Sequence, residues 1–69
     1  MKIISFTVNG VKKYVKDYKF DITGHSLTAS DFIEDAILVP DNEPILIHCI
    51  LNLVELTYGK CPMEVSNAK

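Results

Sequence analysis

The 69-residue chain contains no arginine and no tryptophan, and its only cysteines are Cys49 and Cys61. Two cysteines cannot form the disulfide framework that stabilises many small secreted domains, so we expect a reducing compartment, the cytoplasm. The absence of arginine argues against base-specific DNA recognition, which usually relies on bidentate arginine contacts. Nucleic acid is therefore not the expected partner.

The chain also lacks the spacing patterns of common enzyme and metal sites. It has no glycine-rich phosphate loop, no CxxC pair and no HExxH motif. His48 and Cys49 are adjacent, but neighbours in a strand point to opposite faces and cannot act together as ligands or as a catalytic pair. His25 lies in a polar turn. We therefore predict no enzyme activity, no catalytic residue, no metal site and no cofactor.

No long uninterrupted apolar run is present either. The most apolar stretch, residues 45–54, is too short to span a bilayer and is interrupted by His48 and Asn52. No targeting segment and no membrane association are expected. A chain of this length makes a single domain, residues 1–69, and its 48% hydrophobic content favours self-association, so a homodimer is expected.

What the chain does have is a strongly uneven charge distribution. Residues 1–19 contain five lysines and one aspartate, whereas residues 20–59 contain seven acidic side chains and no lysine or arginine. Soluble surfaces usually mix both signs, so an unneutralised acidic stretch is a candidate for partner binding. The candidate partner-binding residues are Asp31, Phe32, Glu34, Asp35, Asp41 and Glu43.

The N-terminal third of the chain predicts a β-hairpin over residues 3–22. Asn9-Gly10 suits a two-residue type I′ turn because both residues tolerate positive φ. The apolar alternation changes phase near residues 16–17, which indicates a β-bulge. The turn determines which residues face each other: Val8 with Val11, and Phe6 with Lys13.

Residues 28–38 are predicted to form a helix. Thr28 would be the N-cap with Asp31 at the third helical position, and Leu27 would pack on Phe32 as a hydrophobic staple. Pro40 disfavours a helical conformation in the residue before it and would end the helix near residue 38. Apolar residues at helical spacing would form its buried face: Ala29, Phe32, Ile33, Ala36 and Ile37.

The apolar run that follows supports two interpretations. As a strand over residues 45–57, which its isoleucine and valine content favours, it would complete a three-stranded sheet covered by the helix. As a helix over residues 43–58, it would have a polar stripe, Pro44 near its start and Gly59 at its end. The favoured fold is α+β with the order ββαβ, and the alternative is ββαα. Residues 60–69 are expected to be a polar tail that could be flexible.

The stretch Leu27-Thr28-Ala29-Ser30-Asp31-Phe32, placed after a hairpin and before a polar turn, resembles the small uracil-DNA glycosylase inhibitor of Bacillus podophages. That family mimics DNA with acidic groups and traps an apolar side chain of the glycosylase in an apolar groove. The resemblance implies a three-stranded antiparallel sheet with one helix, and a homodimer. Asp31 and Phe32 match the motif, whereas Ile33 and Ala36 stand where the family has glutamate and tyrosine. Four other acids would then supply the contacts: Glu34, Asp35, Asp41 and Glu43.

These observations favour a small protein inhibitor that blocks a DNA-processing enzyme, with uracil-DNA glycosylase as the expected target. If the chain is phage-encoded, it would act in the host cytoplasm. One alternative is an antidefence inhibitor of another nuclease. A second is a nucleic-acid-binding or regulatory module that uses the lysine-rich hairpin for phosphate pairing and base stacking. The residues concerned are Lys12, Lys13, Lys16 and Lys19, interleaved with Tyr14 and Tyr18.

Overall fold

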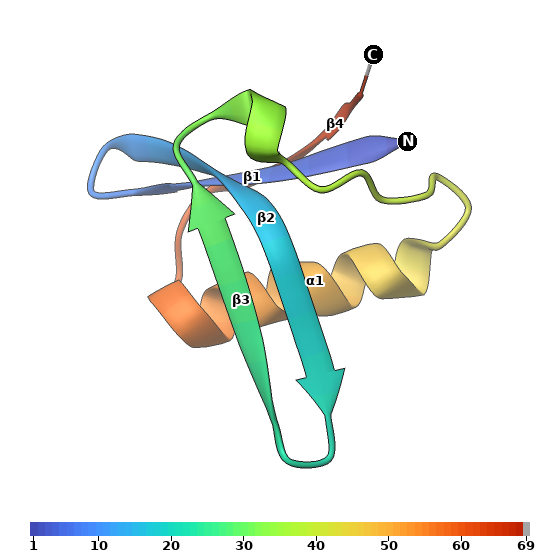
Figure 1. Cartoon of the computed structure of the whole chain (residues 1–69). Coiled ribbons are helices and arrows are strands. Elements are labelled where there is room, and N and C mark those ends of the chain that lie inside the picture. Colours follow the sequence, from blue (N-terminus) through green and yellow to red (C-terminus); the bar gives the residue numbers. More distant parts are fainter. Residues whose placement is uncertain (69) are drawn as a thin grey trace.

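The computed structural model describes residues 1–68, which form one four-stranded antiparallel sheet and one α-helix (Figure 1). The predicted class, α+β with a small antiparallel sheet and a single helix, is confirmed. The strand order across the sheet is β3-β2-β1-β4. The elements are β1 (Lys2–Val8), β2 (Val11–Asp21), β3 (Gly24–Ser30), the 3-10 turn η1 (Ile33–Asp35), α1 (Pro44–Tyr58) and β4 (Met63–Asn67).

The first hairpin has the predicted turn and register. Asn9 and Gly10 both have positive φ, 53° and 78°, which the two-residue turn requires. Val8 faces Val11 and Phe6 faces Lys13, as predicted. The predicted bulge lies between Val15 and Asp17. The second strand ends at Asp21, one residue before the expected end at Ile22.

The predicted helix over residues 28–38 is wrong. Residues 24–30 form β3 instead, with Leu27 opposite Tyr18 and Ala29 opposite Val15. The far half of β2 extends beyond its pairing with β1, and its backbone N–H and C=O groups need partners that β3 supplies. This pairing with the preceding strand overrides the local capping pattern.

Only a single 3-10 turn, η1, follows β3. Phe32 precedes η1 with an extended backbone, φ −110° and ψ 132°, and makes no side-chain capping hydrogen bond. The expected buried face is only partly formed. Ala29, Ala36 and Ile37 are half-buried, but Phe32 and Ile33 are 63% and 53% exposed.

The predicted third strand over residues 45–57 is also wrong, because this run forms α1. Its start and end follow the alternative interpretation: Pro44 is the first helical residue, and the N–H of Gly59 donates to the carbonyl oxygen of Glu55 at 2.8 Å. The rest of that alternative, a second helix in the order ββαα, does not occur. Because β3 already supplies the third strand, the apolar run is free to cover the sheet as a helix.

Part of the expected polar tail is a strand. β4 pairs with β1 on the side opposite β2, with Met63 facing Phe6 and Val65 facing Ile4. Met63 and Val65 alternate with polar residues, a period that suits a strand. Met63 packs against the core, whereas Val65 is exposed. Residue 69 of the tail lies outside the described residues.

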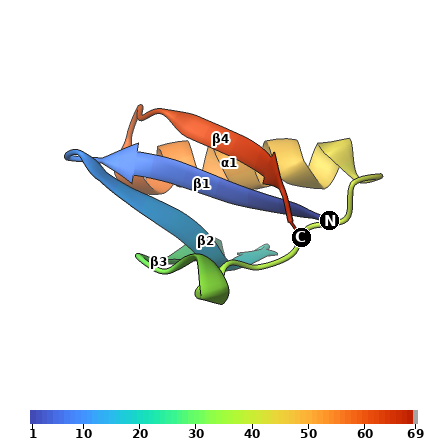
Figure 2. The same ribbon diagram turned by 90° about the horizontal axis from the view of Figure 1, so that it is seen from above.

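The core lies between α1 and the sheet, which bends at the bulge. In Figure 1 the β2–β3 hairpin crosses α1, and in Figure 2 β1 and β4 run along it. Both arms of the bent sheet therefore pack on one helix. The buried cluster joins side chains of β1, β2, α1 and the loop before α1: Ile4, Phe6, Val15, Val39, Ile50 and Val54.

The extended segment of residues 36–40 closes the opening where β2 turns away from β1. The N–H of Ile37 donates to the carbonyl oxygen of Val15 at 2.9 Å. Val39 and Lys2 exchange two backbone hydrogen bonds of 2.6 and 2.8 Å. Val39 is 1% exposed, so this segment is anchored by both backbone pairing and side-chain burial.

Candidate functional site

The six predicted site residues lie on two short segments rather than on one helix. Asp31, Phe32, Glu34 and Asp35 lie in or beside η1, and Asp41 and Glu43 lie in the turn before α1. The extended segment of residues 36–40 separates the two groups. All six side chains are exposed. We call residues 31–43 the acidic–apolar segment.

Two of the acids are neutralised by groups that are distant in the sequence. Lys13 of β2 donates from Nζ to Oδ1 of Asp31 at 2.7 Å, and this hydrogen bond raises the pKa of Lys13 above its ordinary value. The amino group of Met1 lies 3.0 Å from Oδ1 of Asp41. Charges compared along the chain do not reveal either pair. The sheet brings Lys13 beside Asp31, and the pairing of Lys2 with Val39 brings the Met1 amino group near Asp41.

The carboxylates near η1 also contribute to local structure. The Ser30 hydroxyl donates to Oδ2 of Asp35 at 2.6 Å and accepts a hydrogen bond from the N–H of Phe32 at 3.2 Å. This small network holds the end of β3 against η1. Within residues 1–68, no ion pair involves Glu34, Asp35 or Glu43, so these three carry the uncompensated charge of the segment.

Large apolar side chains are exposed among these acids. Phe32, Ile33 and Leu38 are 63%, 53% and 51% accessible to solvent. Exposed apolar groups that cluster on one segment are typical of surfaces that bind another macromolecule. The predicted helix placed both Phe32 and Ile33 on its buried face, and only Phe32 was also a predicted site residue.

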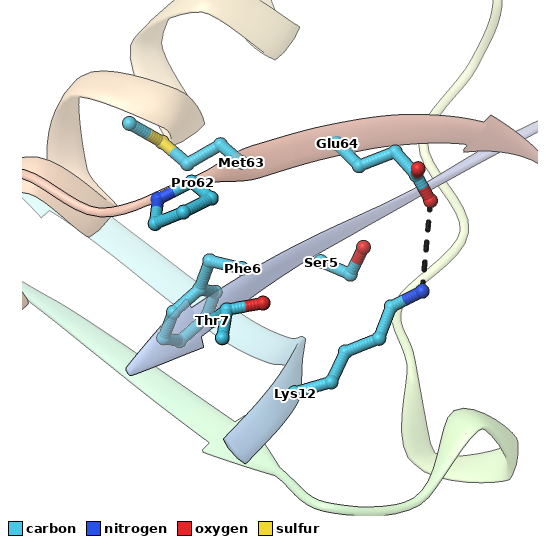
Figure 3. Close-up of a pocket in the computed structure, with 7 residues that line it drawn as sticks. All are labelled: Ser5, Phe6, Thr7, Lys12, Pro62, Met63 and Glu64. Carbon is cyan, nitrogen blue, oxygen red and sulfur yellow. Dashed lines mark ion pairs between the residues drawn. The ribbon is translucent and has the colours of Figure 1, made fainter. Parts of the chain in front are cut away.

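The surface formed by residues 1–68 is hollowed near the sheet and near the acidic–apolar segment. A groove of about 210 Å³ lies over β1, β2 and β4, and Figure 3 shows the Lys12–Glu64 ion pair, 3.6 Å long, beside it. It is smaller than the usual 300–1,000 Å³ of a small-molecule site. Its lining residues are Ser5, Phe6, Thr7, Lys12, Pro62, Met63 and Glu64.

The second hollow, of about 290 Å³, adjoins the acidic–apolar segment. Residues 42–46 line it, and Glu43 is the one predicted site residue among them. It is an open depression where the polar turn meets the first turn of α1. It extends the exposed surface of the segment toward Ile45, whose side chain is 79% exposed.

The lysine-rich strand presents less free charge than its sequence suggests. Lys12 lies 3.6 Å from Glu64, Lys13 pairs with Asp31, and Lys19 lies 3.7 Å from Asp21. Lys12 also lies 5.7 Å from the centre of the Tyr14 ring. Much of the positive charge on β2 is therefore used within the molecule.

Histidine and cysteine do not gather into a reactive site. His25 lies on β3 opposite Phe20, and His48 and Cys49 are exposed on α1. Over residues 1–68, Cys49 and Cys61 are free thiols, and no group of three or more His, Cys, Asp or Glu residues could hold a metal ion. The same residues include no helix that is both long and apolar enough to cross a membrane.

No protein-family model matches the chain, and no match was found among curated proteins or among solved structures. The features available for functional inference are therefore the fold, a small α+β sheet with one covering helix, and its surface. On that surface, the acidic–apolar segment combines negative charge with exposed apolar side chains.

Proposed function

We propose that this protein binds another protein and inhibits a DNA-processing enzyme by imitating the charge of DNA. The acidic–apolar segment carries this proposal, because it exposes carboxylates and large apolar side chains on the same stretch of chain. A DNA-binding cleft is basic and attracts negative charge over long range. Complementary charge would speed the encounter, and buried apolar contacts would supply affinity.

The backbone of the segment supports such binding because it is held in place at its middle. Ile37 and Val39 are hydrogen-bonded to Val15 and Lys2. These bonds hold the backbone in place between the exposed residues on either side. A surface that is already ordered loses less conformational entropy on binding. Glu34 and Asp35 would make the charged contacts, and Phe32 with Ile33 would make the apolar ones.

The proposed target is uracil-DNA glycosylase, and this choice rests on the sequence resemblance. Asp31 and Phe32 match the inhibitor motif, although residues 27–30 form β3 where the family begins its helix. Asp31 is paired with Lys13, so the charge offered to the enzyme would come mainly from Glu34, Asp35 and Glu43. The proposed place of action is the cytoplasm, which is that of the host if the chain is phage-encoded.

The direct test is uracil excision from a labelled oligonucleotide by a bacterial uracil-DNA glycosylase, with this protein in excess. We expect excision to be blocked, and the double variant Glu34→Lys/Asp35→Lys to relieve the block. The matched control is Asp17→Lys/Glu64→Lys, which changes the net charge equally outside the segment. Undiminished excision with the wild-type protein excludes this target. Equal relief by both double variants excludes the segment as the contact.

The nearest rival target is a different nuclease, which the same acidic–apolar chemistry could block. Capture from a bacterial lysate with the wild-type protein and with Glu34→Lys/Asp35→Lys would identify an enzyme retained only by the first.

The lysine-rich hairpin is a weaker candidate site, because three of its lysines lie within 4.0 Å of carboxylates. If the protein is retained on DNA in a salt-dependent way, and a Lys12→Ala/Lys16→Ala variant is not, the hairpin becomes the stronger candidate site.

A further inference from the structure

The outer face of α1 carries a row of exposed residues without charge. Ile45 and Leu56 are 79% and 71% exposed, and Cys49 and Asn52 lie between them. The spacings of four, three and four residues place all four on one stripe, as in the a and d positions of a coiled coil. The opposite face of the helix buries Ile50, Leu53 and Val54 against the sheet. We call Ile45, Cys49, Asn52 and Leu56 the α1 seam.

We propose that the α1 seam pairs antiparallel with the α1 seam of a second copy of this chain. A two-fold axis at the middle of the helix places Ile45 against Leu56 of the partner subunit. The same axis places Cys49 against Asn52 of the partner subunit. The stripe is therefore complementary to itself, which an isologous dimer requires. No like charges meet along it.

Polar residues beside the seam favour the antiparallel arrangement. His48 and Glu55 are both exposed and lie on the same side of the stripe, seven residues apart. In an antiparallel pair, His48 lies near Glu55 of the partner subunit, so an imidazole N–H can donate to a carboxylate twice per dimer. A parallel pair would not bring these residues together. The antiparallel arrangement therefore brings a hydrogen-bond donor to an acceptor, and it also brings apolar side chains together.

The size of the helix limits the strength of the dimer. Fifteen residues make a helix about 22 Å long. A standard interface of roughly 1,600 Å² uses about 20–30 residues per partner, which is more than this helix contains, so the pair belongs to the weaker class below about 1,200 Å². The dimer should therefore be reversible and concentration-dependent. Because the α1 seam shares no residue with the acidic–apolar segment, its dimerisation can be tested whether or not the protein inhibits any enzyme.

Sedimentation velocity over a range of protein concentrations tests the interface. The wild-type protein should shift from monomer to dimer as its concentration rises. Leu56→Glu, which places a carboxylate in an apolar contact, should remain monomeric. Thr57→Glu adds the same charge one residue away from the seam and should behave as wild type. Circular dichroism checks that each variant retains its helix. A wild-type monomer at the highest soluble concentration, or an undiminished Leu56→Glu dimer, would overturn the proposal.

Disulfide trapping tests the direction of pairing. One chain carries Cys49 alone, with Cys61→Ser, and the other carries Asn52→Cys with Cys49→Ser and Cys61→Ser. The two chains, given different masses by a tag, are mixed and oxidised with diamide. Disulfides need Cα atoms about 4.4–6.8 Å apart, so the antiparallel pair should yield mostly mixed dimers. A predominance of the two homodimers would show parallel pairing and contradict the arrangement proposed.

Discussion

At the scale of single residues, Asp21 shows how one carboxylate closes a turn. Its Oδ1 atom accepts hydrogen bonds from the N–H and the hydroxyl of Thr23, at 2.8 and 2.5 Å, where β2 turns into β3. These hydrogen bonds favour the ionised form and lower the pKa of Asp21 below its ordinary value. The carboxylate therefore stabilises the hairpin only while it is charged.

The sign of the pH dependence follows from that lowered pKa. The stabilisation is fully present above the unfolded pKa of about 3.9 and is lost as the pH falls through the lower pKa of the folded protein. NMR titration of the side-chain carboxyl should show Asp21 titrating below the ordinary value, and Thr23→Ala should return it toward that value. Ser26→Ala, on the neighbouring strand, should leave the titration unchanged. An Asp21 pKa at or above the ordinary value would contradict this account.

The candidate site shows which properties of a residue can be predicted without the fold. The five acids are exposed, as expected, because acids and polar turns are rarely buried. Phe32 is exposed as well, although the expected helix placed it on the buried face. The net charge that these six residues present to a partner could not be predicted from the sequence in the same way. Lys13 neutralises Asp31 only because β3 brings residue 31 beside residue 13, and no pattern in the acidic stretch contains that information.

At the scale of elements, the accuracy of prediction follows the range of the interactions. The hairpin at Asn9-Gly10 was predictable because positive φ at two adjacent residues is a local requirement. The stretch from Leu27 to Phe32 was not, because its capping pattern competes with unpaired backbone groups of β2 that only the folded sheet reveals. In the run from residue 45 to 58, the polar spacing and the end signals predicted the helix better than isoleucine and valine content predicted a strand.

Ile50 is one of the residues through which α1 packs on the sheet. Its side chain is fully buried in the cluster that joins α1 to the sheet. Ile50→Ala should lower the free energy of unfolding by about 2–5 kcal/mol, because it removes buried methyl groups and leaves a cavity. Ile50→Val should cost less, about 0.5–1.5 kcal/mol. Urea denaturation monitored by circular dichroism measures both.

The matched control for this prediction is Thr57→Ala, an exposed position on the same helix. It should change the free energy of unfolding by less than about 0.5 kcal/mol, because the hydroxyl has no buried contact to lose. A similar loss for Thr57→Ala and Ile50→Ala would mean that the loss at Ile50 does not come from packing on the sheet. Intrinsic helical preference cannot explain such a loss, because alanine is a better helix former than either residue.

At the scale of the whole molecule, two candidate surfaces meet where the acidic–apolar segment ends and α1 begins. The seam lies on the outer face of α1, whereas the acidic–apolar segment runs from the end of β3 to the turn before the helix (Figure 1). Residues 36–40, in the middle of the acidic–apolar segment, are hydrogen-bonded to both β1 and β2. A partner bound to the acids would therefore contact a stretch of chain that is attached directly to the core.

Native-state hydrogen exchange can measure how firmly that attachment holds. The amides of Ile37 and Val39 donate to carbonyl oxygens of Val15 and Lys2, and Val39 is buried, so opening them requires disruption of the core. We expect their protection to approach that of β1 amides, because such sites exchange only through large openings. The amide of Asp35, bonded within the exposed η1 turn at 3.1 Å, should exchange much faster. Equal, rapid exchange at all three amides would show that the acidic–apolar segment is loosely attached, and would remove the argument that its exposed side chains are ordered before a partner binds.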